Sequence, residues 1–298
     1  MTTPTTVPTT QRSIHRIVRE HGHHWVGDGF RVKGLLSYND HELSRRTSPF
    51  LLLDYHPPYE YGPTDRPRGV GVHPHRGFET VTLAFEGSVA HHDSTGSGGV
   101  INRGDVQWMT AASGILHKEY HEAEWAKRGG TFHMAQLWVN LPAAHKMDAP
   151  GYQGLTADDI ASVDLPDAAG TVRVIAGTFD GRSGPARTFT PVNLWDVQLA
   201  AGRSVDLPFA ATHNVAVLVI GGSASVGGQQ ATDGELVVFE NDGDVVFVTS
   251  DDGARFLVLS GEPIDEPVVG YGPFVMNTTD EIRQAFADFD RGAFGRLD

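Results

Sequence analysis

The chain has 298 residues, of which 40% are hydrophobic and 20% are charged, and its formal net charge is −14. This composition is typical of a folded globular protein, and the negative charge argues against a broad electrostatic surface for nucleic acids. Cysteine is absent, which excludes disulfides and thiolate metal sites. The 15 histidines are more informative, because imidazole is the commonest metal ligand.

The first twelve residues, MTTPTTVPTTQR, are rich in Thr and Pro and predict a disordered tail. They lack the cationic and apolar segments of a secretory signal peptide. No apolar run approaches the roughly 18 residues that indicate a membrane helix. We therefore expect a cytoplasmic protein without a membrane segment.

From residue 13 to residue 145 the pattern predicts short strands separated by turns. A Gly-Asp-Gly turn at 27–29 lies between apolar runs, as in a β-hairpin. Residues 49–53 read as a buried strand, and the Pro-rich segment 55–69 reads as a loop. Residues 131–140 alternate enough to predict another strand.

The second half predicts more strands and one helix. Residues 141–170 read as a linker with one short helix, and β-rich runs with turn signals every 8–12 residues follow, as in a sandwich or barrel. Thr278 and Glu281 have the spacing of a capping box. The four apolar residues after them share one helical face, which predicts a C-terminal amphipathic helix packed on a barrel: Ile282, Ala285, Phe286 and Phe289.

A weak internal repeat relates the two halves. Eight residues separate Glu79 from Gly87, and eight separate His213 from Gly221, inside similar apolar runs. Aligning the halves places apolar or hydroxyl side chains of the second half, Leu207, Phe209, Phe247 and Thr249, opposite His73, His75, His117 and Glu119 of the first. The repeat therefore predicts two similar barrels, of which only the first holds a metal.

Two clusters at the ends of residues 71–119 form the candidate metal site. His73 and His75 are two residues apart, as are His117 and Glu119, and residues two apart on a strand point to the same face. Two such pairs on neighbouring strands would place three imidazoles and one carboxylate around a point. This donor set suits iron, manganese, nickel, copper or zinc better than magnesium or calcium.

Glu79 competes with Glu119 for the carboxylate position. It has the strand parity of His73 and His75, and the order His-x-His-x3-Glu followed by a later His resembles the cupin pattern. Spacing alone leaves both glutamates open. Two further sets of polar residues are predicted to have no role as metal ligands. The first, His91, His92, Asp93 and His121, is predicted to be pocket wall or surface, and the second, His21, His23 and His24, a solvated or partly packed loop.

The motifs HPHRGFETV, HHDSTG, GDVQWMTA, SGILHKE, QLWVNLPAAHKM and SGEPIDEPVVGYGPFVMNTTDEI resemble the pirin family of the cupin superfamily. The resemblance covers almost the whole chain after the tail. It implies an all-β fold of two tandem cupin (double-stranded β-helix, or jelly-roll) barrels with a C-terminal α-helix. The implied domains are a metal-binding domain at 13–145 and a metal-free domain with the helix at 146–298.

The family's metal ligands lie in a His-x-His and a later His-x-Glu, which correspond to His73, His75, His117 and Glu119 here. The resemblance thus favours Glu119 and implies a second-shell or pocket role for Glu79. The implied metal is Fe(II), with Mn, Ni, Co, Cu or Zn as alternatives. The implied activity is that of a quercetin 2,3-dioxygenase, in which Glu119 is the catalytic base toward a flavonol and O2 opens the ring.

The family also contains regulatory proteins that bind another enzyme or a transcription factor in a redox-sensitive way. A protein partner is therefore the alternative to a flavonol-like small molecule. Direct binding to nucleic acid is not expected. Family membership alone does not choose between the two roles.

Overall fold

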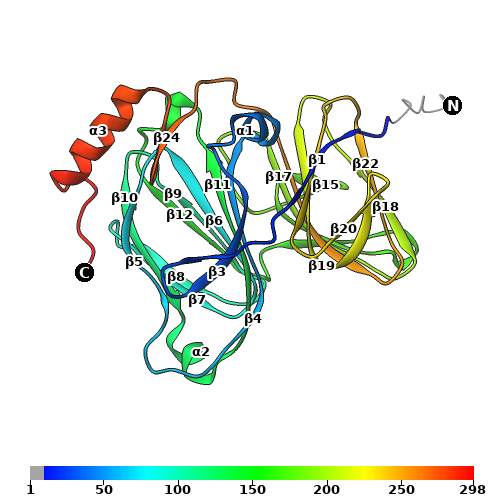
Figure 1. Cartoon of the computed structure of the whole chain (residues 1–298), viewed down its shortest axis with the longest axis horizontal. Helices are drawn as coiled ribbons and strands as arrows, with labels where there is room; N and C mark the ends of the chain where they lie inside the picture. The colour runs from blue at the N-terminus through cyan, green and yellow to red at the C-terminus, as the bar shows by residue number, and fades with distance from the viewer. Residues whose placement is uncertain (1–9) are drawn as a thin grey trace.

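Antiparallel strands dominate residues 10–298, the part of the chain that the computed structural model describes, and they form two barrels side by side (Figure 1). This arrangement confirms the predicted all-β fold of two cupin barrels with one C-terminal helix. Residues 1–9 of the predicted tail lie outside the part of the chain that the structure describes. Arg12 is buried and donates hydrogen bonds to the backbone oxygens of His213 and Ala210, so this residue belongs to the folded protein and not to a tail.

The N-terminal barrel is built from two sheets. The seven-stranded sheet has the order β12 (Gly151–Leu155), β9 (Val106–Thr110), β6 (Phe78–Glu86), β11 (Gly130–Asn140), β4 (Phe50–Tyr61), β3 (Phe30–Leu36) and β2 (His24–Val26). The four-stranded sheet has the order β5 (Gly69–His75), β10 (Ile115–His121), β7 (Val89–Asp93) and β8 (Gly98–Ile101). Two short helices connect strands of this barrel, α1 (His41–Thr47) and α2 (Ala123–Arg128).

The C-terminal barrel is one ten-stranded sheet. Its main path runs β1 (Ile14–Arg19), β21 (Glu235–Phe239), β19 (Asn214–Val226), β23 (Ala254–Gly261), β17 (Val192–Leu199), β14 (Gly170–Ala176) and β13 (Ala161–Asp164), and β18 (Arg203–Pro208), β20 (Gln229–Thr232) and β22 (Val245–Ser250) complete it. The remaining elements are the hairpins β15 (Thr178–Phe179) with β16 (Arg182–Ser183) and β24 (Val269–Tyr271) with β25 (Phe274–Met276), the 3₁₀ turns Ala143–His145 and Pro166–Ala168, and α3 (Thr279–Asp290).

Most predicted elements of the N-terminal barrel are confirmed. β2 and β3 form the hairpin around residues 27–29, and β11 covers the strand predicted at 131–140. The Pro-rich segment is only partly a loop, because β4 continues to Tyr61 through pairing with β11. Pro57 falls at the register shift of that pairing, where a missing N–H does not break the ladder.

The predicted linker at 141–170 is instead built largely of strands and 3₁₀ turns. β12 pairs with β9 and so extends the N-terminal barrel past residue 145, while β13 pairs with β14 and begins the C-terminal barrel. The two sheets therefore divide between residues 155 and 161, later than the predicted boundary.

Both ends of the chain pack against the barrel more distant in sequence (Figure 1). β1 pairs with β21 of the C-terminal barrel, although it precedes the N-terminal barrel. α3 and the β24–β25 hairpin lie on the N-terminal barrel, where Phe274, Ile282 and Ala285 are buried together and Leu116 packs against them. α3 therefore packs on the N-terminal barrel, although it follows the C-terminal barrel in sequence.

The C-terminal helix itself is confirmed. Thr278 caps it, with the reciprocal capping box to Glu281 in place. Asp288, on its buried side, forms an ion pair of 2.8 Å with Arg76, which lies at the end of β5. No helix among residues 10–298 is long and apolar enough to cross a membrane.

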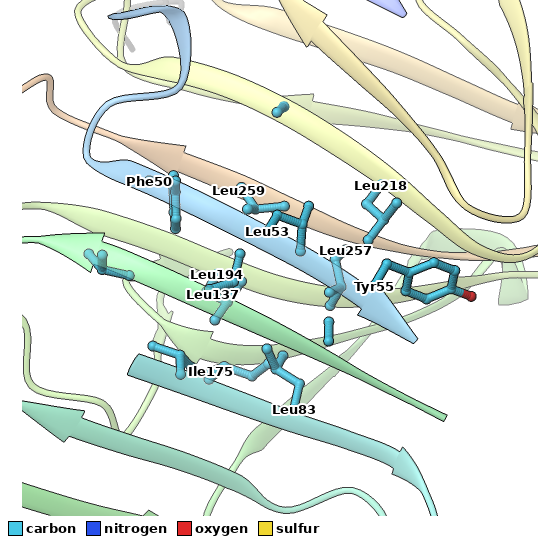
Figure 2. Close-up of a cluster of buried hydrophobic side chains, with 14 of the residues drawn as sticks. Phe50, Leu53, Tyr55, Leu83, Leu137, Ile175, Leu194, Leu218, Leu257 and Leu259 are labelled. Carbon is cyan, nitrogen blue, oxygen red and sulfur yellow. The ribbon is translucent and has the colours of Figure 1, made fainter. Parts of the chain in front are cut away.

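A shared apolar layer joins the two barrels (Figure 2). Leu53 and Tyr55 on β4 lie close to Leu218 on β19 and Leu257 on β23, and all four are fully buried. The Tyr55 hydroxyl adds a polar contact, because it donates to the Asp233 carboxylate of the C-terminal barrel at 2.5 Å. Since alternate residues of β4 face this layer, the residues between them face the interior of the N-terminal barrel.

Candidate metal centre

Three histidines converge inside the N-terminal barrel. β5 and β10 pair antiparallel, with His117 directly opposite His73. The ring centroids are 4.1 Å apart for His73 and His117, 4.8 Å for His75 and His117, and 4.9 Å for His73 and His75. One ring nitrogen from each lies within 4.8 Å of the others. The strand pairing therefore brings together the three predicted histidines.

Hydrogen bonds turn the rings of this group so that one nitrogen of each remains for a ligand. His73 Nδ1 lies 2.8 Å from the Gly71 oxygen, His75 Nδ1 lies 3.4 Å from the Pro273 oxygen, and His117 Nδ1 lies 3.4 Å from His91 Nδ1. His117 Nε2 is buried without a hydrogen-bond partner among residues 10–298. A buried acceptor in this position fits a metal ion, because metal-binding histidines use their second nitrogen for outer contacts.

The local electrostatics keep His75 and His117 neutral. Burial, followed by the neighbouring His73, lowers the pKa of His75 well below its usual 6.5. Burial, followed by His75 and His73, lowers the pKa of His117 in the same way. Neutral imidazole is the form that binds a metal, so the site is ready for a cation near neutral pH.

Glu119 lies on the same strand, just beyond a register shift that separates it from His117 in the pairing with β5. It is 8% exposed, lines the same cavity as His73 and His75, and its Oε1 lies 3.3 Å from the Thr82 hydroxyl. Its carboxylate falls within 4.8 Å of ring nitrogens of His117 and His91, in a second group that shares His117 with the first. Glu119 therefore lies beside His117 and lines the same cavity as His73 and His75.

Glu79 points away from this site. The turn at Arg76-Gly77, where Gly77 has φ +90°, interrupts the strand and breaks the parity with His73 and His75. Glu79 instead accepts a hydrogen bond of 2.7 Å from Thr110, and burial raises its pKa to about 7. Its strand neighbours Val81 and Leu83 face the layer between the barrels. A second-shell or pocket role for Glu79 is therefore wrong.

Three residues form contacts behind His117: His91 and Asp93, which the sequence pattern left as pocket wall or surface, and Gln107, which it did not single out. His91 is fully buried, and its Nε2 lies 3.4 Å from the Asp93 carboxylate. Gln107 Nε2 lies 3.2 Å from His91 Nδ1. These contacts, which run from Asp93 and Gln107 through His91, orient the His117 ring from outside the group of three histidines. On β7, residues 91 and 93 are buried and residue 92 between them is exposed. The sequence indicates this alternation only by the spacing His-x-Asp.

The other histidines lie elsewhere. His92 is exposed, as the surface interpretation predicted. His121 is buried in an aromatic cluster with Phe30 and Trp125, and its Nε2 donates to the Gly29 oxygen at 2.9 Å. It is therefore a core residue, neither pocket wall nor surface. The histidines at 21, 23 and 24 are all exposed, as predicted for a solvated cluster, although His24 belongs to strand β2 and not to a loop.

A cavity of about 330 Å³ opens in front of the histidines. Its walls are mostly apolar, and the C-terminal segment contributes Gly272 and Pro273 to its rim. Cavities of this size and polarity are typical of small-molecule sites. The remaining lining residues are Val26, Phe30, Val32, Val70, Val89, Met134 and Trp138 among the apolar ones, and Asp54, Thr82, Gln136, His73, His75 and Glu119 among the polar ones.

The equivalent region of the C-terminal barrel is filled by apolar side chains. Leu207 and Phe209 are buried there, as the repeat predicted. The residues predicted opposite His117 and Glu119 are shifted by one position. Leu207 pairs with Val246, so Val246 and Val248 point inward, while the Phe247 side chain is 38% exposed. A one-residue shift reverses the face of every side chain on a strand. The prediction that Phe247 and Thr249 occupy ligand positions is therefore wrong.

Comparisons with known proteins agree with this architecture. The family model described as Pirin matches residues 29–139, and the Pirin C-terminal cupin domain matches residues 194–295. The chain is 52% identical over 273 residues to "Putative quercetin 2,3-dioxygenase PA2418" of Pseudomonas aeruginosa, covering 92% of this chain and 95% of that one. It is 41% identical over 270 residues to a pirin-like protein of Caulobacter vibrioides, covering 90% and 94%.

A crystal structure titled as quercetin 2,3-dioxygenase from Acinetobacter baumannii superposes with a TM-score of 0.93 at 44% identity. The match covers 97% of this chain and all of that one. The two barrels, the histidine cluster of the first barrel and these matches agree with one another. The chain therefore belongs to the pirin family.

Proposed function

We propose that this protein is an iron-dependent dioxygenase of the quercetin 2,3-dioxygenase type, which opens a flavonol with O2 and releases carbon monoxide. The observation that carries the proposal is a cluster of three histidines with a carboxylate beside His117, of which His73, His75 and Glu119 line an apolar cavity of about 330 Å³. The Acinetobacter baumannii structure, whose title names this activity, supports the choice of reaction.

In this proposal His73, His75, His117 and Glu119 hold the ion. Three imidazoles and a carboxylate suit Fe(II), and also Mn, Ni, Co, Cu or Zn. When bound, such an ion supplies Lewis acidity and open coordination positions for small ligands. The other steps fall to side chains of the protein.

Glu119 takes the proton of the flavonol 3-hydroxyl. Glu119 Oε1 lies 3.3 Å from the Thr82 hydroxyl, on the cavity wall. Phe30 and Trp138 lie on the cavity wall, where aromatic and apolar side chains bind the flat ring system and exclude water. A general base in hydrogen-bonding reach of its proton typically contributes about 10²–10⁴-fold in rate.

The test is oxygen uptake together with loss of flavonol absorbance by the iron-loaded protein. We expect turnover by the wild type, and a loss of at least about 10²-fold in kcat for Glu119→Gln. Glu124→Gln serves as the matched control, because Glu124 is an exposed glutamate in the first turn of α2. Absence of turnover with Fe, Mn, Ni, Co and Cu would contradict the proposal.

The regulatory alternative, in which the protein acts by binding another enzyme or a transcription factor, stays a prediction, as does the cytoplasmic location. Binding to another protein does not require a cavity with polar groups at the histidine cluster. For this reason the enzymatic role is placed first. A native pull-down, compared for reduced and oxidised iron, tests the alternative.

A further inference from the structure

A row of polar side chains crosses the wall of the cavity in front of the histidines. Thr82 on β6 pairs with Gln136 on β11, and Gln136 pairs with Asp54 on β4. Residues in register on neighbouring strands point to the same face, about 4.8 Å apart. All three line the cavity, so the sheet presents a line of polar groups on an otherwise apolar wall.

The row begins beside Glu119 and ends two strands away. The Thr82 hydroxyl lies 3.3 Å from Glu119 Oε1 at one end. Asp54 stands two strands further along the sheet, roughly 10 Å from Thr82. Apolar residues such as Val32 and Met134 line the same cavity. The polar row Thr82–Gln136–Asp54 therefore crosses a wall that is otherwise apolar.

Hydrogen bonding within the row leaves two groups for a ligand. Thr82 Oγ1 donates to Gln136 Oε1 at 2.7 Å, which occupies the amide oxygen and leaves the amide N–H groups. The Asp54 carboxylate is half-buried, and no donor among residues 10–298 hydrogen-bonds to it. Burial raises the pKa of Asp54 to about 6, while His24 acts in the opposite direction. A desolvated carboxylate without a partner is costly to the fold.

The neighbouring strand leaves room beside this carboxylate. Gly34 on β3 pairs with Asp54. A Cβ atom at Gly34 would lie 3.5 Å from Asp54 Oδ1 and 3.5 Å from His24 Cε1. The absence of a side chain at this position therefore keeps the carboxylate uncovered on that side.

We propose that Asp54 and the Gln136 amide form a second polar anchor of the cavity, which binds a hydroxyl group of the substrate remote from the histidine cluster. The inference rests on the proposed function, since it takes the cavity as the flavonol site. A phenolic hydroxyl matches the pair because it donates to the Asp54 carboxylate and accepts from the Gln136 N–H. A methyl ether only accepts, and a hydrogen atom does neither, so this anchor selects polyhydroxylated flavonols.

The experiment is an anaerobic titration of the iron-loaded protein, followed by the absorbance of the ligand, so that binding is separated from turnover. Three probes are compared: a flavonol whose only hydroxyl is at position 3, flavonols with further hydroxyls on the outer rings, and the methyl ethers of those hydroxyls. The wild type should bind one of the polyhydroxylated flavonols about 10–100-fold more tightly than the first probe, as expected for a hydrogen bond to a charged group.

Asp54→Ala should remove this preference and change the affinity for the simple flavonol less than about threefold. Asp54→Asn keeps the side-chain shape, and in this variant the ratio of the affinities for the polyhydroxylated and the simple flavonol should fall about tenfold. Asp65→Asn removes an exposed carboxylate of the same barrel and should leave the preference intact. Because Asp54 has no protein partner, Asp54→Asn should also keep or raise Tm, whereas a structural carboxylate would lower it when replaced.

An undiminished preference in Asp54→Ala or Asp54→Asn would overturn the anchor and leave the proposed function standing. A fall in Tm for Asp54→Asn with an unchanged preference would do the same, because it would assign the residue to the fold. If the wild type binds none of the flavonols, the proposed function itself fails and the anchor fails with it. Loss of the preference at unchanged metal content supports the anchor.

Discussion

His117 is the residue on which the metal assignment depends most. Its Nε2 is buried and meets no partner in the described part of the chain, and its ring is within 5 Å of both other histidines of the cluster. Replacing it by Ala should lower bound iron by more than about tenfold, since even outer-shell partners typically contribute 10–100-fold. Metal analysis of the purified variant measures this. His92→Ala, at an exposed position on the neighbouring strand β7, should keep wild-type iron.

His91 tests whether the contacts behind the cluster orient His117. His91→Phe keeps the ring that stacks on Tyr152 and removes the nitrogen that faces His117 Nδ1. We expect the affinity for iron to fall about 10–100-fold, measured by competition with a chelator of known affinity. Unchanged affinity would show that the ring of His117 is held without this contact.

His121 predicts one component of the pH dependence of stability. Burial lowers its pKa from 6.5 to about 4, so below pH 6.5 the unfolded chain is protonated at this site while the folded protein is not. The contribution of this pKa difference to the free energy of unfolding is fully present above pH 6.5. It is lost as the pH falls toward 4, by about 3 kcal/mol in all. His121→Phe should lose less stability than the wild type between pH 7 and pH 4.

Denaturant unfolding at several pH values measures the difference between the two proteins. His92→Phe is the control, because an exposed histidine at that position should leave the wild-type slope unchanged. Parallel pH profiles for the wild type and His121→Phe would contradict the assignment of a buried, neutral His121.

At the residue scale, the sequence could predict which clustered histidines lie two apart on one strand and share a face. His73 and His75 share a face because no turn interrupts them. Glu79 could not be placed, because its face depends on the conformation of Arg76-Gly77. Asp54 could not be found at all, because its role arises from strands that become neighbours only after folding.

At the scale of elements, α3 holds the C-terminal segment over the rim of the cavity. The buried pair of Arg76 and Asp288 fixes the helix to the N-terminal barrel, and the segment before it places Pro273 next to His75. Asp288→Asn leaves the Arg76 charge without its partner, at a cost of about 1–3 kcal/mol. We expect protease to release fragments that include α3 roughly tenfold faster than from the wild type.

Mass spectrometry of the released fragments measures this rate. Asp290→Asn changes an exposed carboxylate of the same helix and should cleave as the wild type does. Equal rates for Asp288→Asn and Asp290→Asn would contradict the role of the ion pair.

The elements also show where sequence patterns stop being informative. The capping box and the apolar face predicted α3 correctly, because both are local features. The barrel that α3 covers is set by contacts more than 160 residues apart in sequence, such as Leu116 with Ile282. The one-residue error in β22 has the same origin, since pairing with β18 fixes its register.

At the scale of the whole molecule, the two barrels share one apolar layer but differ inside (Figure 2). In the N-terminal barrel, histidines and a cavity occupy the interior, whereas in the C-terminal barrel, Leu207, Val246 and Val248 fill the corresponding region. The exchange of the chain ends, with β1 on the C-terminal barrel and α3 on the N-terminal barrel, adds contacts between them. Chemistry is therefore expected in one barrel only.

Anomalous diffraction from crystals of the iron-loaded protein, collected on both sides of the iron absorption edge, tests this account most directly. We predict one iron peak per chain, bounded by His73, His75, His117 and Glu119, and no peak inside the C-terminal barrel. An iron peak at any other group of residues, or no peak in protein that contains one iron per chain, would contradict the assignment of the metal centre.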